Sequence, residues 1–187
     1  MKTRITTILA ACVMAEALPG KATADEPLYG YVYTTDALPK GQREIEQWAT
    51  LREGRSKGDF HVWQARTEVS YGLTDRFQGS AYLNLAYADV FHNTPGGETA
   101  PPEIFADYSV GPDKRFKRGR LEGVSVEGFY RLTSPYTAPV GIALYVEPTI
   151  GPRTRELESR AIVQKNFYDD RLVVAGNITA GQEWRRL

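Results

Sequence analysis

Apolar and polar residues alternate with a period of two along most of the chain after residue 41. Between Trp63 and Tyr71 the odd positions are Trp, Ala, Thr, Val and Tyr, and the even positions are Gln, Arg, Glu and Ser. Successive side chains of a β-strand point to opposite faces, so this alternation predicts a strand with one apolar and one polar face. The pattern predicts seven long strands, at about residues 42–52, 60–71, 77–90, 121–132, 140–150, 155–167 and 171–185.

The predicted strands are long, and aromatic residues lie near their ends. Strands of about ten residues can cross a hydrocarbon layer when tilted, whereas strands of soluble sheets usually have about five or six. The aromatic residues that would form an interfacial girdle are Trp63, Tyr71, Phe77, Tyr87, Phe167 and Trp184. We therefore expect an all-β fold, an antiparallel up-and-down transmembrane β-barrel. A soluble β-domain, whose wet face also alternates, is the alternative.

The connections between the predicted strands differ in length. The short connections are residues 72–76, 133–139 and 168–170. Outer-membrane barrels have short periplasmic turns and longer extracellular loops, so the long stretch 91–120 is expected to be an outer loop. Within it, Pro101-Pro102 followed by Glu103 favours a single helical turn.

The N-terminus resembles an export signal. Lys2 and Arg4 form a positive region, a mostly apolar stretch follows, and Ala22-Thr23-Ala24 is an A-x-A cleavage site. We expect residues 1–24 to be a signal peptide cleaved after Ala24. The alternative is a lipoprotein signal, because the residues that precede Cys12 resemble a lipobox. Residues 25–41 would then be an N-terminal aromatic segment near the periplasmic mouth, and residues 42–187 would form the barrel strands.

Composition excludes several classes of function. The chain has 23 basic and 23 acidic residues, and nucleic-acid binders usually carry a basic excess. It has no run of about 18 apolar residues, so no helical membrane span is expected. Its single cysteine, Cys12, would leave with the signal peptide, which excludes a disulfide, a cysteine metal site and a cysteine nucleophile in the mature chain.

Several motifs resemble a family of uncharacterised Gram-negative outer-membrane β-barrel proteins. The opening Tyr29-Gly30-Tyr31-Val32-Tyr33-Thr34-Thr35-Asp36, followed by Leu38-Pro39-Lys40-Gly41, is similar to theirs. The other stretches that carry the resemblance are residues 44–48, 71–76, 130–136, 143–148 and 164–167. The resemblance implies a fold and an outer-membrane location, and no activity comes with it. Members of that family extend beyond the position of Leu187, so the chain is expected to be truncated at its C-terminus.

The number of predicted strands also indicates a truncated chain. Bacterial single-chain barrels have an even number of strands, eight at least, and seven do not close. If residues 28–35 were an eighth span, the loop at 91–120 would fall in the periplasm. We therefore interpret residues 28–35 as a plug or strand cap near the periplasmic mouth. Closure would then require a longer chain or another copy.

The predicted polar faces are rich in charge. The side chains expected to face the lumen are Glu44, Glu46, Arg52, Arg66, Glu68, Glu127, Arg131, Glu147, Glu158, Arg160, Glu183 and Arg185. They could select solutes in a pore. Alternatively, they fill a narrow lumen and neutralise one another, and this is the interpretation that we favour.

The long loop contains a basic cluster. Its cations are Lys114, Arg115, Lys117, Arg118 and Arg120. They could contact lipopolysaccharide phosphates. Alternatively, they could be the solvated face of a loop with nearby carboxylates, which is the interpretation we favour.

No sequence pattern supports an enzyme, a cofactor or a metal. His61 and His92 are the only histidines; neither has a second ligand at metal-site spacing, and His61 has no evident serine partner for a lipid hydrolase. We expect a non-enzymatic, porin-like small channel or structural barrel, with outer-membrane lipid and the barrel-assembly machinery as partners. The alternative is a barrel, membrane-set or soluble and periplasmic, that binds a lipid or small ligand; a membrane enzyme is a weaker option.

Overall fold

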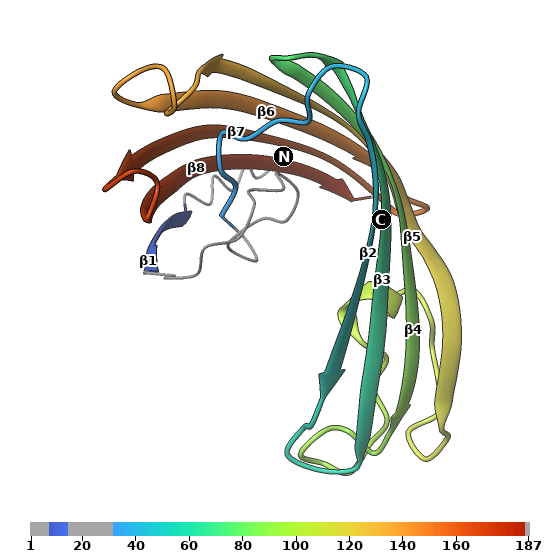
Figure 1. The fold of residues 1–187 in the computed structure, drawn as a ribbon. Coiled ribbons are helices and arrows are strands. Elements are labelled where there is room, and N and C mark those ends of the chain that lie inside the picture. Colours follow the sequence, from blue (N-terminus) through green and yellow to red (C-terminus); the bar gives the residue numbers. More distant parts are fainter. Residues whose placement is uncertain (1–7, 15–31, 186–187) are drawn as a thin grey trace. The chain divides into compact units, whose positions relative to one another are not determined.

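Seven long strands follow one another as an up-and-down meander in one antiparallel sheet, which confirms the expected all-β, antiparallel up-and-down architecture (Figure 1). The computed structural model describes residues 8–14 and 32–185. The seven strands are β2 (Arg43–Glu53), β3 (Asp59–Thr74), β4 (Phe77–Phe91), β5 (Phe116–Thr133), β6 (Gly141–Ile150), β7 (Thr154–Phe167) and β8 (Leu172–Arg185). The sheet order is β1-β8-β7-β6-β5-β4-β3-β2, and the sheet is not closed over the described residues.

One further strand, β1 (Ile8–Met14), pairs antiparallel with β8. Ile8 lies opposite Thr179, and Met14 lies opposite Val173. This strand falls within residues 1–24, where the sequence predicts a signal peptide. The predicted cleavage site lies outside the described residues, so export and cleavage stay predictions.

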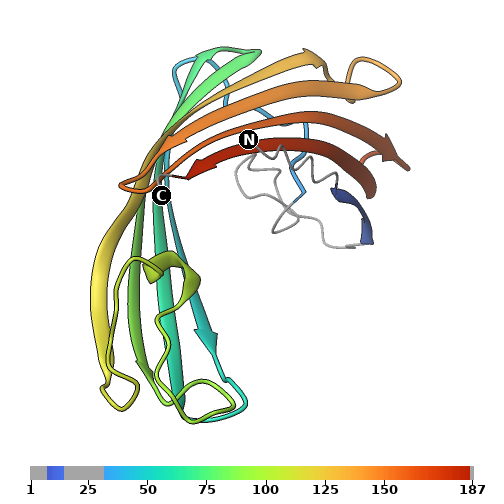
Figure 2. The same ribbon diagram turned by 180° about the vertical axis from the view of Figure 1, so that it is seen from behind.

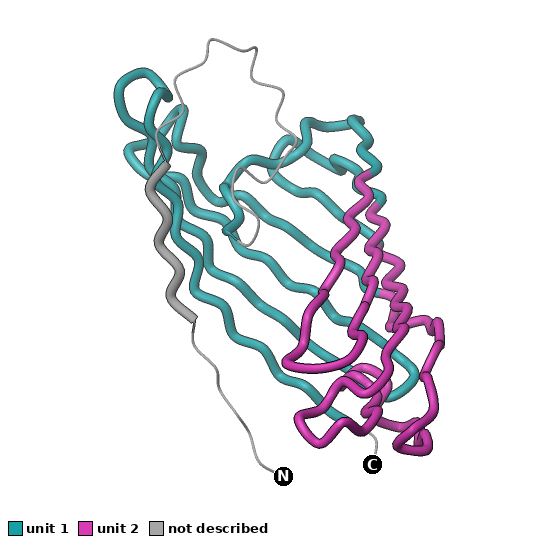
Figure 3. The backbone as a smooth tube through the Cα atoms, turned by 90° about the horizontal axis from the view of Figure 1, so that it is seen from below, with its two compact units in different colours: residues 1–45, 69–81, 125–187 teal, residues 46–68, 82–124 magenta. Residues whose placement is uncertain are grey.

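The chain divides into two compact units (Figure 3). Unit 1 comprises residues 1–45, 69–81 and 125–187, and unit 2 comprises residues 46–68 and 82–124. Each unit is built from parts of the long strands and has its own buried cluster, and each is described below by itself.

The long connection is shorter than the sequence predicts. β5 begins at Phe116, five residues before the expected start at 121, so the connection between β4 and β5 is residues 92–115 and not 91–120. The reason is that Phe116 is buried against Phe105, with ring centroids 5.5 Å apart and an edge-on geometry. Lys117, Arg118 and Arg120 therefore lie on a strand, which corrects their assignment to the loop.

In unit 1 the two faces of the sheet have opposite character. Burial alternates strictly along β6, where Ile142, Leu144 and Val146 are exposed and the intervening residues are buried. The exposed side chains of unit 1 include Val69, Tyr71, Leu73, Phe77, Val126, Tyr130, Leu132, Ile142, Leu144, Val146, Val163, Phe167 and Ile178. The buried polar side chains of its strands are Ser70, Ser80, Ser125, Glu127, Glu147, Gln164 and Asn177. The sheet therefore exposes its apolar face and buries its polar one.

The buried face of unit 1 is covered by residues 32–40, which we call the covering segment. Ala37 of this segment packs in a buried cluster with Phe129, Ala143, Tyr145 and Ile162. Phe129 and Ile162 are the two apolar residues that interrupt the polar positions of their strands. The cluster explains both interruptions, because these side chains pack beneath the covering segment instead of facing water.

Unit 2 contains a different buried cluster. Its residues come from β3, β4, β5 and the short 3-10 helix η1 (Glu103–Phe105), and are Phe60, Val62, Ala86, Ala88, Val90, Phe105 and Phe116. Figure 2 shows the connection 92–115, with η1, lying along the strands of this unit. The expected helical turn after Pro101-Pro102 thus anchors the long connection through Phe105, whose side chain is fully buried.

Candidate functional site

Side-chain amides hold the backbone of the covering segment. Asn177 on β8 pairs with Tyr33 in both directions: the Tyr33 N–H donates to Asn177 Oδ1 (2.7 Å), and Asn177 Nδ2 donates to the Tyr33 carbonyl (2.8 Å). Gln164 on β7 accepts from the Thr35 N–H (2.7 Å) and from Thr35 Oγ1 (2.9 Å). These two amides take the place of a neighbouring strand, because they offer the donors and acceptors that a backbone would offer.

The far end of the covering segment is fixed near the β3–β4 turn. The Leu38 N–H donates to Gln78 Oε1 (2.9 Å), and the Lys40 N–H donates to Asp75 Oδ1 (3.1 Å). The backbone at Gly72 passes so close that a Cβ there would lie 2.1 Å from the Pro39 carbonyl oxygen. Only glycine fits at that position without displacing the segment.

A tyrosine–arginine cluster lies where the covering segment meets β6 and β7. The rings of Tyr33 and Tyr145 are 5.3 Å apart, and the Arg160 guanidinium lies 4.3 Å and 5.0 Å from their respective centroids. Arg160 Nε donates to Glu158, and Tyr145 Oη donates to Glu147. The sheet register creates this cluster, because Tyr145 lies opposite Arg160, and Glu147 opposite Glu158. Cation–π contact and carboxylate pairing both compensate the arginine charge.

The adjoining turn also contacts the covering segment. Tyr136 belongs to residues 134–140, between β5 and β6, and the carboxylate of Asp36 lies close enough to its phenol to influence its ionisation. Partial burial, together with the nearby carboxylates of Asp36 and Asp170, raises the pKa of Tyr136, because both effects disfavour the phenolate. The ionisation of Tyr136 is therefore sensitive to the presence of the covering segment.

The charges predicted to face a lumen differ in burial. Glu127 and Glu147 are buried, whereas Arg52, Glu183 and Arg185 are exposed. The other seven are half-buried: Glu44, Glu46, Arg66, Glu68, Arg131, Glu158 and Arg160.

Most of these charges have partners of their own. Arg185 Nε donates to Glu183 Oε1 (2.7 Å), and Arg131 donates to the Asp75 carbonyl (2.6 Å) at the β3–β4 turn.

Unit 2 repeats the arginine–tyrosine–carboxylate arrangement on a smaller scale. The Arg66 guanidinium lies 3.8 Å from the centroid of Tyr82, whose hydroxyl donates to Glu68 (2.9 Å). Gln64 Nε2 donates to the carboxylate of Glu122 at 2.9 Å. Charge on the polar positions is again compensated within the protein.

The basic cluster is largely neutralised by internal carboxylates. Arg115 pairs with Asp59 and Asp89, Lys117 pairs with Asp89 (2.9 Å), and Arg120 pairs with Asp107 (2.7 Å). The Arg118 guanidinium lies 4.3 Å from the centroid of Tyr108, and Lys114 is exposed. These ion pairs weaken the lipopolysaccharide hypothesis, because three of its five cations already have carboxylate partners.

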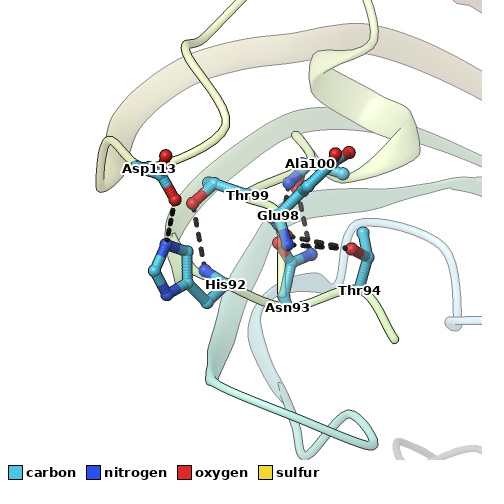
Figure 4. A network of polar contacts seen from close by, with 7 residues as sticks. All are labelled: His92, Asn93, Thr94, Glu98, Thr99, Ala100 and Asp113. Atoms are coloured by element: carbon cyan, nitrogen blue, oxygen red, sulfur yellow. Dashed lines mark hydrogen bonds and ion pairs between the residues drawn. The ribbon is translucent and has the colours of Figure 1, made fainter. Parts of the chain in front are cut away.

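Side chains also organise the start of the long connection (Figure 4). Asn93 pairs with the Ala100 backbone in both directions (3.0 and 2.8 Å), and Thr94 does the same with Glu98 (3.1 and 3.2 Å). His92 has a positive φ of 46°, donates its N–H to Thr99 Oγ1, and lies 3.0 Å from Asp113 through Nε2. The other histidine, His61, lies 3.1 Å from Glu53. Both imidazoles thus contact a carboxylate, His92 that of Asp113 in the long connection and His61 that of Glu53 at the end of β2.

The sequence did not identify the side chains that bind the covering segment. Gln78, Gln164 and Asn177 occupy polar positions of their strands and look like ordinary inward-facing amides. The available signal was the pair of apolar residues, Phe129 and Ile162, on otherwise polar faces. Such interruptions indicate that another part of the chain lies against that face.

The comparisons with known proteins decide the family. The chain belongs to the Family of unknown function (DUF6662). Residues 21–186 match this family. No curated protein and no solved structure matches the chain significantly. Over residues 8–14 and 32–185, no helix is long and apolar enough to span a membrane, and no group of three or more His, Cys, Asp or Glu could hold a metal ion.

Proposed function

We propose that this member of DUF6662 is a non-enzymatic outer-membrane β-barrel protein, exported by residues 1–24, in which the covered face forms the lumen. The barrel acts as a small passive channel or as a structural element of the membrane. One observation carries the proposal. Unit 1 exposes its large apolar side chains and buries carboxylates and amides on the opposite face.

Soluble antiparallel sheets have the opposite arrangement of apolar and polar faces. They turn apolar side chains to the core and polar ones to water. Here Leu144 is 49% exposed and Val126 is 58% exposed, whereas Glu127 and Glu147 on the same strands are buried. Exposed apolar surface on this scale is unfavourable in water and favourable against lipid. The aromatic residues near the strand ends fit the headgroup level of a membrane.

The paired charges favour a filled lumen over a strongly selective pore. Arg160 pairs with Glu158, and the covering segment occupies the face that would otherwise be wet. Charges that already have partners are less available to bind solutes. The same occupancy argues against a lumen that holds a lipid or small ligand, because the protein's own residues fill it.

A membrane setting requires partners for the edges of the sheet. Unpaired backbone groups in hydrocarbon cost several kcal/mol each, so both edge strands must be hydrogen bonded there. The proposal therefore includes closure by a further strand or by another copy, assembled by the barrel-assembly machinery. Crosslinking between cysteines placed on β2 and β8 tests how the edges are satisfied.

Cell fractionation tests the location. We expect the protein in the outer-membrane fraction, with a band that migrates faster in unheated than in heated detergent samples, as closed barrels do. The N-terminus of the isolated protein should be Asp25. Recovery from the soluble periplasm, with no effect of heating, contradicts the proposal and favours the soluble ligand-binding alternative. Co-purification of a lipid or small molecule with that soluble form would support the alternative directly.

A further inference from the structure

We infer that the covering segment is a displaceable plug, which closes a water-accessible path along the covered face and opens it by leaving that face. This inference rests on the proposed membrane function and deepens it. It assigns a gating role to residues 32–40, and it makes Gln164 and Asn177 the residues that hold the gate shut.

The first argument is how the segment is held. Its backbone is hydrogen bonded to Asn177 of β8, Gln164 of β7 and Gln78 of β4, and each of these contacts is a side-chain amide. A strand in a ladder exchanges backbone bonds along its whole length, whereas this segment is bound at separate points. When it leaves, the strands keep their own ladders intact, and water can replace the segment on each amide.

The second argument is the polar character of the face to which the segment is bound. The buried side chains of the covered face include Ser70, Ser80, Glu127 and Glu147, all of which water solvates well. Uncovering them costs far less than uncovering a hydrophobic core, because polar groups regain hydrogen bonds to water. The apolar cluster around Ala37 and the buried contact between Val32 and Ala175 oppose release.

Unit 2 provides the contrast. There the connection 92–115 lies over Phe60, Val62 and Val90, and inserts the fully buried Phe105 among them. Removing that connection would expose a cluster of aromatic and aliphatic side chains to water. The connection in unit 2 is therefore a permanent part of the fold, whereas the covering segment of unit 1 is built to be released.

The third argument is the pivot. Gly41 follows the segment and has a φ of 83°, and a Cβ at this position would have no atom within 4 Å. Its N–H donates to the Gly72 carbonyl (2.8 Å), and the Gly72 N–H donates to the Gln42 carbonyl (3.0 Å). The chain is thus fastened at Gly41 and Gln42, and glycine gives the backbone the freedom to swing the preceding residues about that point.

A reversible crosslink tests the plug. Val32 and Ala175 form a buried contact of their own, and they lie on the segment and on β8. We would prepare Val32→Cys/Ala175→Cys in a Cys12→Ala background, isolate it from outer membranes, and record single-channel currents in planar bilayers. The oxidised protein should be silent, and dithiothreitol should restore the currents of the background protein. The single-cysteine variants are the controls.

Release variants provide the second arm. Gln164→Ala/Asn177→Ala removes the amides that hold Tyr33 and Thr35, and should raise the open probability about 30-fold or more. Asn93→Ala is the matched control, because Asn93 is a buried amide that binds the backbone of unit 2.

The outcomes separate the two proposals. Absence of the protein from the outer membrane overturns the proposed function, and the plug with it. A heat-modifiable, membrane-inserted protein overturns the plug alone if the release variant conducts no better than the background. The plug is also overturned if the oxidised crosslink leaves the currents unchanged, or if the two cysteines fail to form a disulfide.

Discussion

Replacing Gln164 by alanine should release the covering segment without disrupting the sheet. Gln164 is 1% exposed, and its Oε1 accepts from both the N–H and the hydroxyl of Thr35, which is itself fully buried. The backbone of residue 164 stays paired in β7, because only the side chain is removed. The change therefore acts on the contact between the segment and the strand.

The size of the effect of Gln164→Ala follows from the two Thr35 donors that lose their acceptor. A buried donor without a partner costs about 1–3 kcal/mol, and two such donors that share one acceptor give about 2–4 kcal/mol in total. Because about 1.4 kcal/mol corresponds to a factor of ten, the undocked population should rise by about 30-fold to 1,000-fold. Water that enters the space left by the amide moves the result toward the lower end.

Hydrogen exchange in detergent micelles measures this population. The Thr35 amide should exchange faster by the stated factor, and the amides of β7 should be unaffected. Gln164 Nε2 also donates to Asn166 Oδ1 (2.9 Å), so Asn166→Ala is the matched control that removes this bond and leaves Thr35 bound. Gln164→Glu keeps an acceptor oxygen and should retain slow exchange. Equal exchange rates at Thr35 in Gln164→Ala and Asn166→Ala would refute the reasoning.

Three further predictions concern the apolar face, unit 2 and the turn at 134–140. Leu144→Arg places a charge on the exposed apolar face and should cost about 2–4 kcal/mol near the bilayer centre, which lowers the outer-membrane yield; Thr137→Arg, in an exposed turn, should not. Phe105→Ala empties a fully buried site and should lower the free energy of unfolding in urea by about 3–5 kcal/mol; a loss below 1 kcal/mol would contradict the packing. Asp36→Asn should lower the raised pKa of Tyr136 toward its ordinary value, so that the phenol ionises at lower pH; the ultraviolet titration difference against Tyr136→Phe measures it, and an unchanged pKa counts against the contact.

Strand positions followed from the sequence because the alternation of side chains is a local property. The expected strand at 140–150 matches β6 at Gly141–Ile150, and that at 155–167 matches β7 at Thr154–Phe167. The start of β5 was misplaced by five residues. The sequence predicts a charged loop at residues 114–120, because nothing in that stretch shows that Phe116 packs against Phe105, eleven residues earlier in a helical turn.

The role of the basic cluster depended on distant partners. Arg115 reaches Asp59, which is 56 positions away in the sequence, and Asp89, which is 26 positions away. From composition alone, five cations around an aromatic residue suggest an anion site. The fold brings carboxylates from β3 and β4 to the same place, and the charges cancel there.

The sequence alone determined that the chain forms long strands with one apolar and one polar face, because a period of two assigns each side chain to a face without reference to any other part of the chain. The tertiary structure decided what covers the polar face. Tyr33 meets Asn177 across 144 positions, and Thr35 meets Gln164 across 129. No local pattern encodes such pairs, because the same amides would fit a wet lumen equally well. They bind the covering segment only because the register of β7 and β8 places Gln164, opposite Ala175, and Asn177, opposite Ile162, on the face where the segment lies.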